Sequence, residues 1–259
     1  MVGDDTSERM VQAFFHFHAE LNDFLPARRK GLRFAYAFKH RASIKDMIEA
    51  LGVPHTEVDL ILANGTLVGF GYLVRDGDDI AVYPHSIETG WPASARVGPP
   101  RLDEARFVLD SHLGKLAAYL RLLGFDTLYR NDFDDETLAR ISSAEQRILL
   151  TRDRNLLKRS NVTYGYYVRE TAPRQQVVEV LRRFDLLGSI AAYQRCIRCN
   201  GLLQPVHKET IAAQLAPKTR QFYDEFHKCQ TCGQIYWKGS HYEPLQQFIE
   251  HVLRAERSR

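Results

Sequence analysis

The feature that most constrains this chain is a group of cysteines spaced as two Cys-x-x-Cys pairs. The four residues are Cys196, Cys199, Cys229 and Cys232. Each pair can place two thiolates on one tight turn, and two such turns supply the tetrahedral set of sulfurs that Zn²⁺ favours. A catalytic zinc needs an open coordination position, which four cysteines do not leave. A redox pair would stand near the start of a βαβ helix and would need no second pair. The spacing therefore predicts a structural zinc site.

Length and composition indicate a folded protein of several domains. The chain has 259 residues, of which 44% are hydrophobic and 26% are charged, enough for two or three domains with their own cores. No apolar run reaches the ~18 residues of a membrane span. The first ten residues, MVGDDTSERM, lack the basic-then-apolar pattern of a secretory signal. We therefore expect a cytoplasmic protein that does not enter a membrane.

Charge is unevenly spread along the chain. Residues 1–100 carry 10 Lys and Arg against 13 Asp and Glu, whereas residues 101–195 carry 16 against 13 and residues 196–259 carry 9 against 6. The C-terminal two-thirds is therefore mildly basic. Such a balance is compatible with a polyanionic partner such as RNA.

Residues 11–87 predict an α+β domain. Two alternating apolar runs at residues 11–18 and 32–38 indicate strands, and Ser43 indicates the N-cap of a helix over 44–51. Two further strands are expected at 59–63 and 79–83. This order is that of a β-grasp domain. The stretches ASIKDMIEALGVPHTEVDLILANG and VRDGDDIAVYP resemble the ubiquitin-like sulfur-carrier family, which includes the small subunit of molybdopterin synthase.

The resemblance to sulfur carriers does not extend to their chemistry. Carriers of that family end in a free Gly-Gly, whereas this chain continues through HSIETGWPASARVGPPR. We therefore expect a domain that binds a protein partner or packs within the chain rather than one that catalyses. Residues 88–102 are rich in Gly and Pro and predict a linker.

Residues 104–190 predict an α/β domain with a parallel sheet. Apolar strands are expected at 106–109, 126–129, 146–151 and 163–168, and helical patterns separate them. Residues 193–253 form a third expected domain, a zinc ribbon that holds the cysteines, an aromatic segment and a final helix over 244–255.

Acidic residues follow two of the predicted parallel strands. Asp110 and Asp153 each stand directly after a strand, where ligands of parallel sheets bind, and Asp135 opens the helix between them. Three converging carboxylates repel each other unless a cation is bound, and Mg²⁺ or Mn²⁺ prefers such oxygen ligands. Asp also caps helices for purely local reasons, so Asp134 or Asp135 is alternatively a cap.

Basic and aromatic residues surround these motifs. Lys115, Arg152, Arg154 and Lys158 flank the acids and are candidate phosphate contacts, or alternatively a solvated helix start. In the third segment a group of residues can stack on unpaired bases or pack the ribbon core. These residues are Tyr236, Trp237, Lys238, His241 and Tyr242.

The second segment resembles a known nuclease family. FVLDSHLGKLAAYLRLLGFDTLYRNDFDDETLARISSAEQRILLTRDRNLLKRS is similar to the Mut-seven C-terminal ribonuclease domain, a branch of the PIN-like nucleases, and YWKGSHY with two Cys-x-x-Cys pairs is typical of its tail. The resemblance implies a metal-dependent RNase with the strand-end acids as ligands. Related domains often carry a second acid at the position where this chain has Asn155. The neutral amide lowers the negative charge that is available to bind a second ion.

The resulting hypothesis is a metal-dependent, endonucleolytic ribonuclease that uses Asp110, Asp135 and Asp153, with Mg²⁺ or Mn²⁺ at the acids and Zn²⁺ at the cysteines. Its fold would be a PIN-like parallel-sheet domain preceded by a ubiquitin-like β-grasp domain and followed by a zinc ribbon. Two rivals stand beside it: a non-catalytic RNA-binding module, and an adaptor in RNA modification or sulfur transfer.

Overall fold

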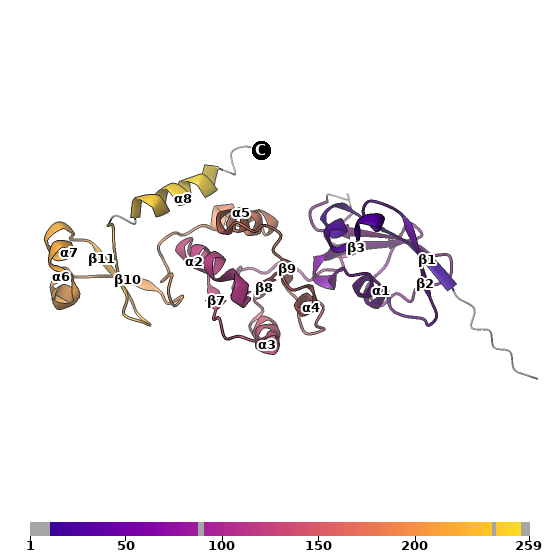
Figure 1. The fold of residues 1–259 in the computed structure, drawn as a ribbon, viewed down its shortest axis with the longest axis horizontal. Coiled ribbons are helices and arrows are strands. Elements are labelled where there is room, and N and C mark those ends of the chain that lie inside the picture. The colour runs from indigo at the N-terminus through magenta and orange to yellow at the C-terminus, as the bar shows by residue number, and fades with distance from the viewer. Residues whose placement is uncertain (1–10, 88–90, 240–241, 255–259) are drawn as a thin grey trace, which may run out of the picture. The chain divides into compact units, whose positions relative to one another are not determined.

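A computed structural model describes residues 11–87, 91–239 and 242–254 (Figure 1). The chain divides into two compact units. The first comprises Met1–Arg101 and Asp153–Tyr167, and the second comprises Leu102–Arg152 and Val168–Arg259. The segment that holds the cysteines thus groups with the sheet of the second unit.

The first unit is built on a mixed sheet with the strand order β2-β1-β5-β3-β4. The strands are β1 Val11–Phe17, β2 Phe34–Phe38, β3 Val58–Ala63, β4 Thr66–Leu67 and β5 Asp79–Pro84, with helix α1 at Ile44–Ala50. Short 3-10 helices occupy Ala19–Phe24, Ala27–Arg29, His55–Glu57 and Ala93–Ala95. Strands β1 and β5 are parallel, and β1 pairs with β2 in the antiparallel sense. The predicted β-grasp architecture is confirmed, and the short β4 is an addition to it.

Local sequence explains the central helix and its sheet. The Ser43 hydroxyl accepts the amide of Asp46 at 3.2 Å, so the predicted N-cap of α1 is present. Alternation along β1 buries Phe15 and Phe17 fully, and these side chains join Ile44 and Ile48 of α1 in one hydrophobic core. The turn after β3 places Asn64 and Gly65 at positive φ, as that dipeptide predicts.

The second unit is built around parallel strands in the order β7, β6, β8. Strand β6 spans Phe107–Leu109, β7 spans Thr127–Tyr129 and β8 spans Ile148–Thr151. The helices that accompany them are α2 Gly114–Leu122, α3 Asp135–Glu145 and α5 Pro173–Arg183. Helix α4 (Arg154–Leu157) and strand β9 (Gly165–Tyr167) belong to the first unit.

The predicted apolar patterns of the parallel strands are confirmed. Phe107, Leu109 and Leu150 are fully buried, and helices α2 and α5 pack against each other. Because the strands run parallel, Asp110 stands at the carboxyl end of β6, whereas Asp126 and Thr127 stand at the amino end of β7. Asp110 therefore lies at the opposite end of the sheet from Asp126 and Thr127.

The cysteines lie at a small antiparallel sheet of the second unit, with Cys229 at the end of one strand and the others in the turns beside it. Its strands are β10 Leu203–Val206, β11 Phe226–Cys229 and β12 Ile235–Trp237, and helices α6 Lys208–Ile211 and α7 Pro217–Phe222 lie between β10 and β11. Helix α8, Tyr242–Arg254, packs Phe248 against Tyr119 of α2 with ring centroids 4.5 Å apart. Further 3-10 helices occupy Ser111–Leu113, Leu187–Ser189 and Ala212–Gln214. Within the described residues, every helix is too short or too polar to traverse a bilayer.

Candidate functional site

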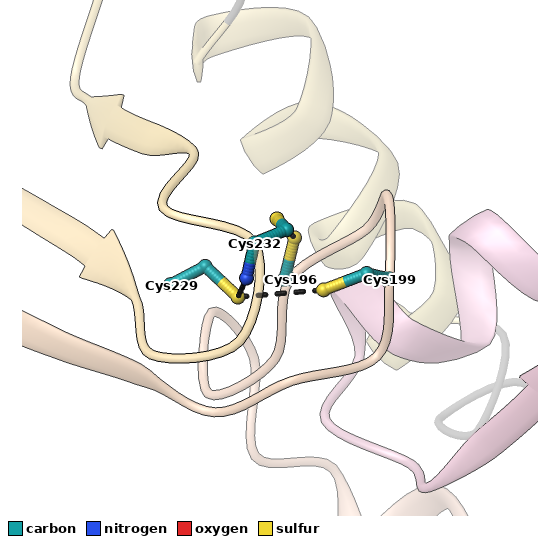
Figure 2. A group of neighbouring side chains, drawn as sticks. All are labelled: Cys196, Cys199, Cys229 and Cys232. Carbon is teal, nitrogen blue, oxygen red and sulfur yellow. Dashed lines mark hydrogen bonds between the residues drawn. The ribbon is translucent and has the colours of Figure 1, made fainter.

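The four cysteines converge from two separate turns. Figure 2 shows Cys196 and Cys199 on one loop facing Cys229 and Cys232 on another. Their sulfurs all lie within 4.8 Å of one another, with 3.4 Å between Cys199 and Cys229 and 3.7 Å between Cys196 and Cys232. A disulfide would require about 2.05 Å. Tetrahedral zinc with Zn–S bonds of about 2.3 Å places sulfurs roughly 3.8 Å apart, so the arrangement fits a zinc ion.

The pKa values of two of these thiols are shifted in opposite directions. Burial raises the pKa of Cys199 to about 12. At Cys229 burial acts in the same direction, but the backbone amides of Cys232 and Thr231 outweigh it and lower its pKa to about 7. Four thiolates at these distances repel one another, so a bound divalent ion is what allows all of them to ionise together.

The first cysteine turn is hydrogen-bonded to the parallel-sheet part of the second unit. Asn200 is 9% exposed, and its side chain accepts the amide of Thr127 at 3.0 Å while donating to Asp126 at 2.9 Å. The guanidinium of Arg121, which is 5% exposed, donates to the carbonyls of Ile197 and Arg198. The sequence indicated Asn200 as a turn residue beside the cysteines, but it did not predict these contacts of Asn200 and Arg121, since both partners of each bond lie more than 70 residues apart in the chain.

A buried ion pair also supports the contact between the cysteine turn and the sheet. Arg147, whose side chain is 6% exposed, donates to Asp126 at 2.7 Å. Burial opposes the charge of Asp126, but the hydrogen bonds from Arg147 and Asn200 outweigh it and lower the pKa of that carboxyl. Asp126 therefore stays ionised and links the start of β7, the residue before β8 and the cysteine turn.

Among the predicted acids, Asp110 has the most enclosed position. The residue is 8% exposed at the end of β6. The Thr151 hydroxyl, at the end of β8, donates to one carboxylate oxygen at 2.7 Å, and the Ser111 hydroxyl donates to the other at 3.1 Å. A carboxylate has about four acceptor positions, so two more remain for a metal or water.

The other two predicted acids stand at helix starts. Asp134 is the N-cap of α3 and accepts the amide of Thr137 at 2.8 Å, which leaves Asp135 as the exposed first residue of that helix. Asp153 is the N-cap of α4 and accepts the amide of Asn155 at 2.7 Å. Among the described residues, the four cysteines are the only group of three or more His, Cys, Asp or Glu side chains placed closely enough to hold a metal ion. Convergence of Asp110, Asp135 and Asp153 stays a prediction.

Three of the four predicted phosphate contacts also make structural contacts. Arg152 donates from one nitrogen to the carbonyls of Val168, Arg169 and Glu170. In the first unit Arg154 donates to the carbonyls of Asp23 and Phe24 and lies over the Phe24 ring, and Lys158 donates to the carbonyl of Glu49 at 2.7 Å. Burial lowers the pKa of Lys158. Lys115 is exposed in the first turn of α2.

Comparison with known proteins decides the family. The Mut7-C RNAse domain model matches residues 105–249, which is more than half of the chain, and the Mut7-C ubiquitin model matches residues 10–89. The chain belongs to the Mut7-C RNAse domain family. No curated protein and no solved structure matches it. The predicted family and the predicted ubiquitin-like head are thus confirmed, and a ribonuclease-related function follows from the Mut7-C domain.

The aromatic segment of the Mut7-C tail divides into two kinds of residue. The Tyr236 hydroxyl lies 3.0 Å from the Cys196 sulfur, within hydrogen-bond distance, and burial raises the pKa of Tyr236. Trp237 is 40% exposed, and Lys238 pairs with Glu225 at 2.8 Å. His241 and the side chain of Tyr242 lie outside the described residues.

Proposed function

We propose that this protein is a metal-dependent ribonuclease that cleaves RNA internally and holds a structural zinc ion at its four cysteines. The observation that carries the proposal is the enclosed carboxylate of Asp110 at the carboxyl end of β6, inside the Mut7-C RNAse domain. Ligands of parallel sheets bind at that end. The hydroxyl of Thr151 from the neighbouring strand fixes the carboxylate at 2.7 Å.

The proposal assigns a role to each acid. Asp110 would hold Mg²⁺ or Mn²⁺ together with Asp153, and Asp135 would be a third acidic contact. Bound there, the ion would lower the pKa of water and offset charge on the phosphodiester. Thr151 and Ser111 keep the Asp110 oxygens in place, so their loss should weaken metal binding rather than abolish the fold.

The proposed RNA contacts follow from exposure and charge. Lys115 is exposed one residue into α2, close in sequence to Asp110, and is the candidate phosphate contact with the fewest structural duties. Arg152, Arg154 and Lys158 also hold backbone carbonyls. We infer that these three side chains mainly hold the chain that follows β8 in position. Any contact that they make with phosphate would be in addition to this role. The ubiquitin-like domain would serve a protein partner.

The test is a cleavage assay on zinc-loaded full-length protein with Mn²⁺ or Mg²⁺ added. Wild type is compared with Asp110→Asn and Asp153→Asn, and Asp103→Asn serves as the matched control because Asp103 is exposed and precedes β6. A lost metal ligand removes several kcal/mol of transition-state stabilisation. The expected loss is therefore about 100-fold or more for the two ligand variants, with no change for the control.

A circular single-stranded RNA separates the two modes of cleavage, because only an endonuclease can open it. Linear product that depends on Asp110 would support the proposal in full. Cleavage that survives both ligand substitutions would sink it. RNA binding without any metal-dependent cleavage would instead favour the rival, a non-catalytic RNA-binding module.

A further inference from the structure

The small cysteine-bearing sheet contains a cavity that the zinc site and the acids do not use. It encloses about 440 Å³, which is within the range of small-molecule and cofactor sites. Apolar side chains, including Leu122, Ile197 and Ile235, form much of its lining. Tyr193, Tyr236 and Trp237 add aromatic rings.

Trp237 lines this cavity and is only partly covered by its neighbours. Its directly opposed neighbour on β11, Phe226, is only 2% exposed and lies beside the indole with ring centroids 6.4 Å apart, whereas Trp237 remains 40% exposed. Gly239 lies against the indole, since a Cβ at Gly239 would approach the indole nitrogen within 2.6 Å. Tyr236, in contrast, is tied to the Cys196 sulfur. The indole thus has a defined place and an accessible surface.

The charge around the cavity favours an anionic occupant. Residues 193–239 hold seven Lys and Arg against three Asp and Glu. His227 and Lys238 lie at the lining, and Glu225, the acid beside them, is already paired with Lys238. An apolar, aromatic cavity in a basic surface suits a nucleobase that carries a phosphate.

We propose that this cavity binds one unpaired nucleobase of single-stranded RNA, with Trp237 as its stacking surface. The choice of RNA rests on the proposed function. The zinc ion fixes the cavity indirectly, because Tyr236 forms one wall and is bonded to Cys196. The ribbon is then an RNA-binding element as well as a structural one.

The position of the cavity makes it an anchor and not part of the cleavage centre. Leu122, in its lining, ends α2, whereas Asp110 precedes that helix. Helix α2 has 9 residues and is therefore about 13 Å long. If one base is held beside Leu122, a nucleotide further along the same RNA strand would lie at Asp110.

The binding test uses zinc-loaded full-length protein in an Asp110→Asn background, so that RNA is not cut. Affinity for a fluorescent oligo-uridine is measured by anisotropy for Trp237→Ala, Trp237→Phe and the control Phe222→Ala. Phe222 is a 68% exposed aromatic residue at the end of α7, outside the cavity lining. Because Trp237→Ala removes the stacking of one base, it should weaken binding about 5- to 150-fold. Trp237→Phe should retain most of the affinity, and Phe222→Ala all of it.

A second measurement reads the cavity without RNA. The chain has two tryptophans, so Trp91→Phe leaves Trp237 as the sole indole. Adenosine monophosphate should quench its fluorescence, whereas ribose 5-phosphate should not, since only the former carries a base. Zinc content, measured on every variant, shows that the ribbon is intact.

Equal RNA affinity of zinc-loaded Trp237→Ala and Phe222→Ala would overturn the proposal, as would quenching by both phosphates alike. Trp237-dependent binding in a protein that never cleaves RNA would leave the pocket standing while the proposed ribonuclease activity fails. If Trp237→Ala weakened binding to fully paired RNA as much as to oligo-uridine, this would also contradict the proposal, because paired bases cannot enter the cavity.

Discussion

Asn200 occupies a left-handed backbone position with φ 73°, and both ends of its side-chain amide are bonded. Asparagine tolerates this conformation better than other residues with a Cβ. The side chain also completes the hydrogen bonding of Thr127, whose side chain and backbone are fully buried. Asn200 therefore stabilises both the turn between Cys199 and β10 and the amino end of β7.

Substituting Asn200→Ala should lower the free energy of unfolding by about 1–3 kcal/mol, because it leaves the buried Thr127 amide without its acceptor. Urea denaturation of the zinc-loaded protein measures the change. Gln204→Ala is the control, since Gln204 is an exposed amide on β10, and it should be nearly neutral. Equal stability of the two variants would show that the Asn200 contacts are not made in solution.

Asp126 makes the same junction sensitive to acid. Its pKa is depressed in the folded protein, so its contribution to stability is present above the unfolded pKa of about 3.9 and is lost as the pH falls through the lower folded value. Asp126→Asn should therefore be destabilised near neutral pH, by about 1–3 kcal/mol. The difference from wild type should shrink below about pH 4. A difference that stays constant across that window would exclude this assignment.

Single-residue roles were predictable from sequence only where spacing or adjacency defined them. The two Cys-x-x-Cys pairs define their own partners, and Ser43 caps a helix through an amide three residues away. Asn200 and Arg121 depend on partners more than 70 residues distant, which no local pattern encodes. Choosing between Asp134 and Asp135 required knowing at which residue α3 begins, and helix boundaries are the least certain part of a pattern.

At the scale of elements, the end of α2 is fixed by a close backbone approach. Gly124 has φ 99°, and a Cβ there would overlap the carbonyl oxygen of Ala191 and lie 2.8 Å from its carbonyl carbon. The amides of Ala191 and Tyr193 bond to the carbonyls of Leu123 and Leu122 at the same place. The chain that leads to the first cysteine turn thus runs along the end of this helix.

Gly124→Ala should destabilise the protein by more than about 1 kcal/mol, because it combines an unfavourable left-handed backbone with a backbone clash. That corresponds to a fall in the unfolding temperature of roughly 2–4 °C per kcal/mol in a chain of this size. Gly188→Ala is the matched control, since a Cβ there meets no atom within 4 Å. The thermal melt of the control should match that of wild type, and a similar fall in both would refute the explanation.

Most elements followed from the sequence. Alternating and helical apolar patterns predicted the β-grasp strands, the parallel strands and helices α2, α3 and α5, because these elements bury one face each. The two-residue strand β4 is too short to show a period. The segment 153–167 was expected in the parallel-sheet domain, and its strand β9 is the fourth strand of that sheet, although the segment counts by compactness with the first unit. His55 and Glu57 hold it there through Val162 and Tyr167, contacts that sequence order does not reveal.

At the scale of the molecule, the ubiquitin-like part and the zinc site contribute differently. The first unit has its own core, with Phe15, Phe17 and Ile48 fully buried, and contains no cysteine. In the second unit the cysteine turn is joined by side-chain hydrogen bonds to the ends of α2 and β7. Zinc should therefore stabilise the second unit as a whole, and not the small ribbon alone.

Removal of zinc tests this coupling directly. Elemental analysis should find about one zinc per chain, and Cys196→Ser should lose it. On chelation, hydrogen exchange at the Thr127 amide should accelerate, because its acceptor Asn200 lies on the turn that zinc holds. The β3–β5 ladder of the first unit is the internal control and should keep its protection, since its hydrogen bonds and core are independent of the cysteines. Protection at Thr127 that survives complete zinc removal would mean that hydrogen bonds alone hold the turn, and that the metal organises only the ribbon beyond it.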